Sequence, residues 1–254
     1  MTSPPRPSLA LTGERTLPGI PDERYWFERH VVAYDLAGRD VAGKRVLDAG
    51  CGEGYGLAHL IGAGAATATG VDLEPAVIDH IQATYATDPR IEAMRADLGA
   101  LPLEDASIDR AVSFQVIEHL HDVPAYLAEL RRVTAAGGDV HIATPNRLTF
   151  TPGSDAPVNP FHVREFTADE LAAELRDAGF VVQTVVGVHH GRRLRAVERL
   201  AGRPLTDLLA SGEPPTWPRW VRAVVHRVRH TWFEVRPDDL DASLDLIAVA
   251  RPAP

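Results

Sequence analysis

The chain has 254 residues, of which 45% are hydrophobic, and a formal net charge of −9. A chain of this length can bury a sizeable core and is compatible with one domain that carries an insertion. The negative charge argues against a general binder of nucleic acid or other polyanions. No apolar run reaches the roughly 18 residues of a membrane span, and residues 1–6 lack the apolar core of a signal peptide. We therefore expect a cytoplasmic protein without a membrane partner.

Residues 1–20 contain several prolines and no sustained periodicity, which predicts a loose N-terminal arm. After Pro21, apolar side chains recur at helical spacing from Asp22 to about Ala37, and Gly38 would end that helix. Two interpretations of this helix stay open. It could simply pack on a sheet, or it could form a lid over a bound cofactor.

From residue 45 onward, predicted strands alternate with predicted helices, as is typical of a parallel sheet with helices on both faces. The predicted strands are Arg45 to Asp48, Thr67 to Asp72, Ile91 to Arg95, Ile108 to Phe114, Asp139 to Ala143, Phe180 to Val188 and Ser243 to Ala250. The predicted helices among them are Pro75 to Tyr85, Val123 to Thr134 and Thr167 to Ala178, the last with a capping box at its start. We predict one α/β domain over residues 21–254.

The first strand runs into an acidic residue and a turn rich in glycine, with Asp48 followed by Gly50, Gly52 and Gly54. Glycine reaches positive φ and has no side chain, so a bulky ligand could lie against this main chain where strand becomes helix. A dinucleotide fingerprint needs G-x-G-x-x-G, and here its third glycine is missing in every register. The pattern D-x-G-x-G-x-G instead matches motif I of the class I S-adenosylmethionine-dependent methyltransferases, which the chain resembles.

This resemblance implies a Rossmann-like sheet of strand order 3-2-1-4-5-7-6, in which strand 7 is antiparallel, with S-adenosylmethionine bound at the strand ends. The glycine turn would hold the methionine part, while the ends of the second and third strands would hold the ribose and the adenine. Two residues of the N-terminal helix would reach the methionine carboxylate. The cofactor residues implied are Tyr25, Arg29, Asp48, Gly50, Cys51, Gly52, Gly54, Asp72, Leu73, Asp97, Leu98 and Gln115.

A second motif follows the fourth strand, where Glu118 and His119 stand side by side in V-I-E-H. This segment resembles E-V-I-E-H in ubiquinone-pathway O-methyltransferases and small-RNA 2′-O-methyltransferases, in which two glutamates and a histidine hold a divalent metal. Gln115 replaces the first glutamate here, although an amide oxygen can still coordinate a hard cation. His162, in N-P-F-H, would supply a further histidine. The resemblance thus implies Glu118, His119 and His162 as catalytic and metal-binding residues, with Mg²⁺ as the metal. Without a metal, a histidine would act as general base.

Several further segments resemble the mycobacterial methyltransferases of polymethylated polysaccharides, in particular the sugar 1-O-methyltransferases of 3-O-methylmannose polysaccharide biosynthesis. They are G-E-R-T at 13–16, Y-W-F at 25–27, G-C-G-E-G-Y-G at 50–56, Q-V-I-E-H-L at 115–120, T-P-N-R at 144–147, N-P-F-H at 159–162 and S-L-D-L-I at 243–247. The resemblance implies a small oligosaccharide substrate, methylated on the 1-hydroxyl of a short 3-O-methylated mannoside. Three alternatives stay open: methylglucose lipopolysaccharide biosynthesis, RNA 2′-O-methylation, and cofactor binding without catalysis.

The segment from His189 to Asp241 is an insert between the last two predicted strands, where a short hairpin is usual. It is rich in arginine and contains Trp217, Trp220 and Trp232. Arginine with interleaved aromatics could grip nucleic acid, but the same residues serve sugar stacking and protein interfaces. We therefore expect either a substrate lid or a homodimer contact, and do not expect nucleic acid as a partner.

Overall fold

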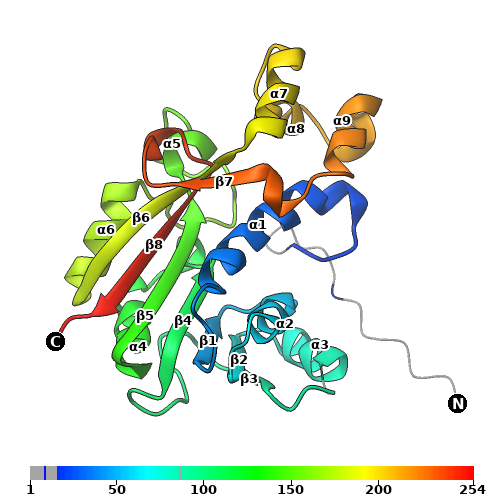
Figure 1. Cartoon of the computed structure of the whole chain (residues 1–254). Coiled ribbons are helices and arrows are strands. Elements are labelled where there is room, and N and C mark those ends of the chain that lie inside the picture. Colours follow the sequence, from blue (N-terminus) through cyan, green and yellow to red (C-terminus); the bar gives the residue numbers. More distant parts are fainter. Residues whose placement is uncertain (1–8, 10–15, 86) are drawn as a thin grey trace, which may run out of the picture.

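The computed structural model describes residue 9, residues 16–85 and residues 87–254 of the chain. Over these residues, the chain forms an eight-stranded sheet that is covered by helices (Figure 1). The predicted N-terminal arm lies mostly outside the described residues. No helix in the described part of the chain is both long enough and apolar enough to cross a membrane.

The strand order is β3-β2-β1-β4-β5-β8-β6-β7. The strands are β1 Arg45–Ala49, β2 Thr67–Asp72, β3 Ile91–Arg95, β4 Ile108–Phe114, β5 Thr134–Pro145, β6 Phe180–His190, β7 Phe233–Arg236 and β8 Asp245–Pro252. The first five strands pair in parallel, whereas β8 is antiparallel to both β5 and β6. The predicted Rossmann-like sheet, with its last long strand returning between the fifth and the sixth, is confirmed.

Two features of the sheet differ from the prediction. Strand β5 begins at Thr134, which pairs with Ile108 of β4. The register of this pairing then shifts, because Arg110 pairs with Asp139 and the residues between Thr134 and Asp139 form an irregularity. The glycines at 137 and 138 therefore lie within the strand as an irregularity. Strand β7 was not predicted, because four residues in an arginine-rich segment give no alternating signal. It pairs antiparallel with the end of β6 and extends the edge of the sheet.

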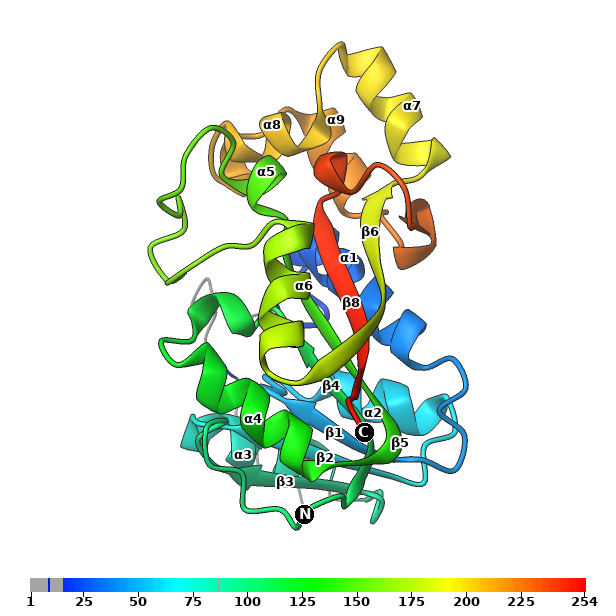
Figure 2. The same ribbon diagram turned by 90° about the vertical axis from the view of Figure 1, so that its left-hand side faces the viewer.

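Helices cover both faces of the sheet, as predicted. One face carries α1 Arg24–Ala37, α2 Tyr55–Gly62 and α3 Pro75–Tyr85, and the other carries α4 Val123–Val133 and α6 Ala168–Asp177. Figure 2 shows α4 and α6 in front of the strands, with α1 and α2 behind. Each face has its own apolar core. The predicted capping box of α6 is confirmed, because the Thr167 hydroxyl and the Glu170 carboxylate each accept from the other residue's backbone N–H.

The insert forms helices α7 Arg192–Ala201, α8 Leu205–Ala210 and α9 Arg219–Val225 before it enters β7. Short helical segments lie at Pro21–Glu23, Ile117–His119, Arg147–Phe150 (α5), Pro214–Thr216, His230–Trp232 and Leu240–Ala242. Buried side chains of the insert, such as Leu208 and Val221, belong to the same apolar core as α1. Arg222 and His226 also pair with Asp22, at 3.0 and 2.7 Å. The insert is therefore packed on the N-terminal helix, while its function as a dimer contact stays a prediction.

Candidate active site

A cavity of about 950 Å³ lies at the carboxyl ends of β1 and β4, where the order of the strands reverses. Open α/β sheets bind their ligands at this position. Sites for single small ligands occupy about 300–1,000 Å³, so this cavity can hold a nucleoside-sized cofactor with an acceptor beside it. Its walls come from the motif I turn, the ends of β2 and β4, helix α1, the loop after β5, and the insert.

The three predicted glycines of the turn all have positive φ, but they serve different purposes. A Cβ atom on Gly50 would lie 2.5 Å from a methyl group of Val116, and one on Gly54 would lie 2.7 Å from Ile81. Packing within the protein therefore requires these two glycines. At Gly52, a Cβ atom would meet no atom of the described residues within 4 Å, and the residue lines the cavity. The open space at Gly52 is what allows a ligand to approach the main chain.

The next wall fits a ribose and an aromatic base. Asp72 ends β2, and its carboxylate accepts from the backbone N–H groups of Gly52 (3.1 Å) and Glu74 (3.0 Å), which fixes the turn against the strand. Leu73 lines the cavity with 62% of its surface exposed, so it offers an apolar face to a flat ring. Asp97 and Leu98 line the same wall. The residue types suit hydroxyl groups and a heterocycle, as the resemblance implies.

Three of the predicted cofactor residues do not line the cavity. Tyr25 is 1% exposed, and its hydroxyl lies 2.6 Å from Nε2 of His190, so the prediction that it reaches the cofactor is wrong. Asp48 is completely buried beneath the turn and accepts from the Tyr34 hydroxyl at 3.0 Å. Burial raises the pKa of Asp48 to about 7. Gly54 is held by packing, as described above. Asp48 and Gly54 thus support the turn from beneath and do not line the cavity.

Arg29 and Gln115 line the cavity, so their contact with the cofactor stays a prediction, but both side chains are engaged by Asp245. The Arg29 guanidinium pairs with both carboxylate oxygens, at 2.5 Å for Nε and Oδ2. The Gln115 amide donates to Asp245 Oδ1 at 3.3 Å. Gln115 also has a φ of +58°, which is uncommon for a residue with a side chain. Asp245, which the sequence analysis did not single out, therefore fixes two residues of the cavity wall.

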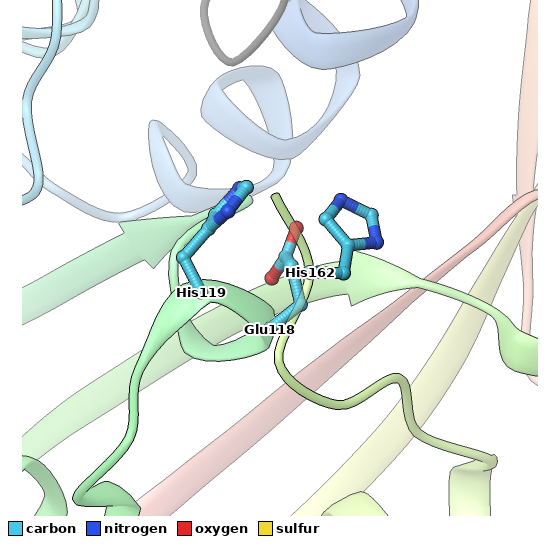
Figure 3. Close-up of side chains that lie close together, drawn as sticks. All are labelled: Glu118, His119 and His162. Carbon is cyan, nitrogen blue, oxygen red and sulfur yellow. The ribbon is translucent and has the colours of Figure 1, made fainter. Parts of the chain in front are cut away.

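Glu118, His119 and His162 come together at the rim of the cavity (Figure 3). Glu118 and His119 lie on the short helix after β4. The loop that carries His162 is attached to that helix, because the backbone N–H groups of Val163 and Arg164 donate to the Glu118 carbonyl at 2.7 and 3.2 Å. One potential ligand atom from each of the three side chains lies within 4.8 Å of the others. The structure thus brings the three predicted catalytic residues together.

The hydrogen bonds of the two histidines decide which ring nitrogen faces the site. Nδ1 of His119 lies 2.9 Å from the Phe161 carbonyl oxygen, and Nδ1 of His162 lies 2.8 Å from the Glu165 carboxylate. Because those oxygens can only accept, we assign the proton to Nδ1 in both rings, which leaves each Nε2 with a lone pair. Burial lowers the pKa of His162. Nε2 of His119 can therefore accept a proton or bind a cation, whereas Nε2 of His162 can do so once a ligand displaces the Asn159 amide, which lies 3.0 Å away.

Glu118 is 1% exposed, and only one of its two carboxylate oxygens has a hydrogen-bond partner among the described residues. That oxygen accepts from the Thr144 hydroxyl at 3.0 Å. Burial raises the pKa of Glu118 to about 8. A buried acceptor without a partner is costly, and a cation or a donor group on a ligand would remove that cost. A carboxylate oxygen with two imidazole nitrogens is a plausible donor set for a divalent metal.

Sequence reasoning missed the residues that hold the candidate catalytic side chains in place. Glu165 is buried and orients His162, and the spacing of three residues between them was the available signal. Thr144 at the end of β5 binds Glu118, and Asn159 lies 3.0 Å from Nε2 of His162. Such residues fix the orientation and tautomer of the groups they contact.

The sheet, the glycine turn at the strand ends and the acid–histidine cluster define a group-transfer enzyme with a nucleoside cofactor. Residues 47–142 match the family model described as a methyltransferase domain. A relative in Mycobacterium tuberculosis, named Probable S-adenosylmethionine-dependent methyltransferase, is 45% identical over 250 residues, which cover 95% of this chain and 89% of the relative. The chain therefore belongs to the class I S-adenosylmethionine-dependent methyltransferases.

More distant relatives agree with this assignment. The ubiquinone biosynthesis O-methyltransferase of Xanthomonas oryzae is 30% identical over 202 residues, 72% of this chain and 81% of that protein. Among solved structures, the complex between the Haloferax volcanii Trm112 methyltransferase activator and a methyltransferase matches 89% of this chain and 91% of that one, with a TM-score of 0.63 and 19% identity. At that identity, the structural match supports the fold alone.

Proposed function

We propose that this methyltransferase acts on a sugar hydroxyl, the 1-hydroxyl of a short 3-O-methylated mannoside in methylmannose polysaccharide biosynthesis. The observation that carries the proposal is the cluster of Glu118, His119 and His162 at the rim of the cavity, in which one potential ligand atom of each side chain lies within 4.8 Å of the others. The mycobacterial relative, whose match covers 95% of this chain, supports methyl transfer from S-adenosylmethionine, and a relative named as an O-methyltransferase supports an oxygen acceptor. The choice of mannose rests on the resemblance of the motifs.

In an in-line displacement, some residues of the cavity would bind the cofactor and others would accept the proton of the acceptor hydroxyl. Bound S-adenosylmethionine supplies a methyl group on a positively charged sulfur, and the turn at Gly52 with Asp72 and Asp97 would hold that cofactor. As the acceptor oxygen bonds to the methyl carbon and the carbon–sulfur bond breaks, the hydroxyl must lose its proton. Nε2 of His119 or His162 can accept it. The anomeric hydroxyl is the most acidic hydroxyl of a sugar, which suits a histidine base.

A divalent cation fits the same cluster. Held by Glu118, His119 and His162, it would lower the pKa of an acceptor hydroxyl. The resemblance favours Mg²⁺, and because imidazole is a better ligand for transition metals than for Mg²⁺, Mn²⁺ is tested beside it. We predict that exhaustive chelation lowers methyl transfer at least about tenfold, a loss that 1.4 kcal/mol of transition-state stabilisation would produce. Added Mg²⁺ or Mn²⁺ should restore the activity.

The measurement combines transfer of a labelled methyl group with Mn²⁺ binding followed by electron paramagnetic resonance. Glu118→Gln should abolish Mn²⁺ binding, and substitution of the exposed His121 to alanine should not. Full activity after chelation, with Glu118→Gln still inactive, would contradict the cation and favour a histidine base that acts alone.

The proposed function is tested with a panel of synthetic mono- and di-mannosides and glucosides. Methyl transfer from labelled S-adenosylmethionine is expected with a 3-O-methylmannoside that has a free reducing end, and NMR of the product should place the new methyl group on O1. A 1-O-blocked analogue should not react. Equal turnover of the blocked analogue would exclude the 1-position. Turnover of a glucose oligomer, but of no mannoside, would instead assign the protein to methylglucose lipopolysaccharide biosynthesis.

A further inference from the structure

One wall of the cavity belongs neither to the cofactor turn nor to the Glu118 cluster. It is built jointly by the start of the N-terminal helix and by the insert. The residues of this wall are Glu23, Trp26, Leu209, Gly212, Pro214 and Trp217. Elements more than 180 residues apart in sequence thus meet at this wall, and the insert closes the cavity on this side.

Trp217 is a fixed part of this wall. It is 4% exposed, and its indole N–H donates to the carbonyl oxygens of Leu209 (3.2 Å) and Gly212 (2.7 Å). Its ring lies 5.8 Å from that of Trp26, at an interplanar angle of 33°. The ring of Tyr25 meets Trp26 from another direction, edge-on at 5.6 Å. Trp26 therefore contacts two buried, hydrogen-bonded rings, while the Trp26 residue itself is half-buried and lines the cavity.

Glu23 lies three residues before Trp26, so its carboxylate and the indole share one face of the helix start. The insert holds this helix start in place, because Arg222 and His226 both pair with the neighbouring Asp22. The wall therefore presents an aromatic surface and a carboxylate in a fixed arrangement. A carboxylate repels phosphate, so this wall is unsuited to a nucleic acid backbone.

We propose that Trp26 and Glu23 form the acceptor subsite, which binds a neutral pyranose ring. The indole covers the apolar C–H face of the ring, and the Glu23 carboxylate accepts hydrogen bonds from hydroxyl groups at its edge. Trp217 is a positioning residue that holds Trp26. The proposal rests on the proposed function, since it states how the sugar acceptor is held. It assigns the insert a function in acceptor selection, in line with the interpretation of the insert as a substrate lid.

The test separates acceptor binding from cofactor binding. Trp26→Ala should raise the KM for 3-O-methylmannose about tenfold or more, in line with the cost of losing one aromatic stacking contact. Its kcat should stay within about threefold, and its affinity for S-adenosylhomocysteine, measured by calorimetry, within about twofold, as expected when only uniform binding is lost. Trp26→Phe should fall between the wild type and Trp26→Ala. Trp217→Phe, which keeps a ring but loses both N–H bonds, should raise KM in the same direction by less.

Trp220→Ala is the matched control. Trp220 belongs to the insert, is 45% exposed and does not line the cavity, so its loss should leave KM unchanged. An unchanged KM in Trp26→Ala with intact cofactor affinity, or an equal rise in Trp220→Ala, would overturn the subsite while wild-type turnover upholds the proposed function. If the wild type methylates no mannoside or glucoside, the proposed function fails, and the subsite fails with it.

Discussion

Glu118→Gln is expected to lower kcat by about 10²–10⁴-fold, the range typical of losing general acid–base assistance. The substitution keeps the volume and an oxygen that can accept from Thr144, but removes the carboxylate of the cluster, which would carry a negative charge when a cation or an imidazolium lies beside it. Without that charge, neither a cation nor an imidazolium is stabilised at the rim. Because the cofactor turn lies on other strand ends, the affinity for S-adenosylhomocysteine should stay within about twofold.

His162→Ala should show a similar loss of kcat, since it removes one of the two proton acceptors and the partner of Glu165. His121→Ala is the control, because His121 is exposed close to the same cluster and does not line the cavity. Single-turnover methyl transfer with the preferred sugar acceptor measures the chemical step. A Glu118→Gln enzyme with near wild-type kcat would show that the cluster is structural and would remove the main support for the mechanism.

Because Glu118 is buried, its ionisation is expected to make the stability of the folded protein depend on pH. Its pKa is about 8 in the folded protein, compared with 4.5 for an ordinary glutamate, so folding disfavours the ionised form. Without a cation, the folded state should therefore lose stability as the pH rises from about 4.5 to about 8. Glu118→Gln cannot ionise and should escape this loss. Its melting temperature relative to the wild type is thus expected to rise with pH over that range.

Much of the fold could be predicted because local signals agree with the tertiary structure. The bounds of β2, β3 and β4 match the predicted runs, since each is a short segment between turn residues in a regular alternation of strands and helices. The glycine turn could be recognised because its D-x-G-x-G-x-G spacing, directly after a strand, matches motif I. The insert was less predictable. Its helices α8 and α9 and strand β7 are fixed by packing on α1 and β6, and elements of six, seven and four residues are too short to show a clear period in the sequence.

In the candidate site, too, residues within one local motif could be predicted, whereas contacts between residues far apart in the sequence could not. Glu118 and His119 follow directly from a motif at a strand end, and the cluster with His162 could be anticipated from the resemblance. The prediction for Tyr25 failed because an aromatic residue at helical spacing fits the core as well as a ligand site. Arg29 and Asp245 are 216 residues apart in sequence, so their pairing depends on how β8 returns into the sheet. No pattern in one sequence reveals such a contact.

Gly52→Val is expected to abolish binding of S-adenosylmethionine and S-adenosylhomocysteine, with a loss of affinity of at least about 100-fold, or roughly 2.7 kcal/mol. The side chain would project into the open space where the methionine part of the cofactor should lie, because no atom of the described residues is within 4 Å of its Cβ position. Gly52→Ala should weaken binding less, since a single methyl group fills less of that space. Calorimetry with S-adenosylhomocysteine measures both variants.

Backbone strain must be separated from the loss of space, because Gly52 has a φ of +52° and any side chain there costs about 1–2 kcal/mol of stability. Gly137→Ala is the matched control. Gly137 also has a positive φ, of +84°, with no described atom within 4 Å of its Cβ position, but it lies in the irregular part of β5 and does not line the cavity. Gly52→Ala and Gly137→Ala should lose similar stability, and only Gly52→Ala should lose cofactor affinity. Unchanged affinity in a folded Gly52→Val variant would show that the cofactor does not approach this turn.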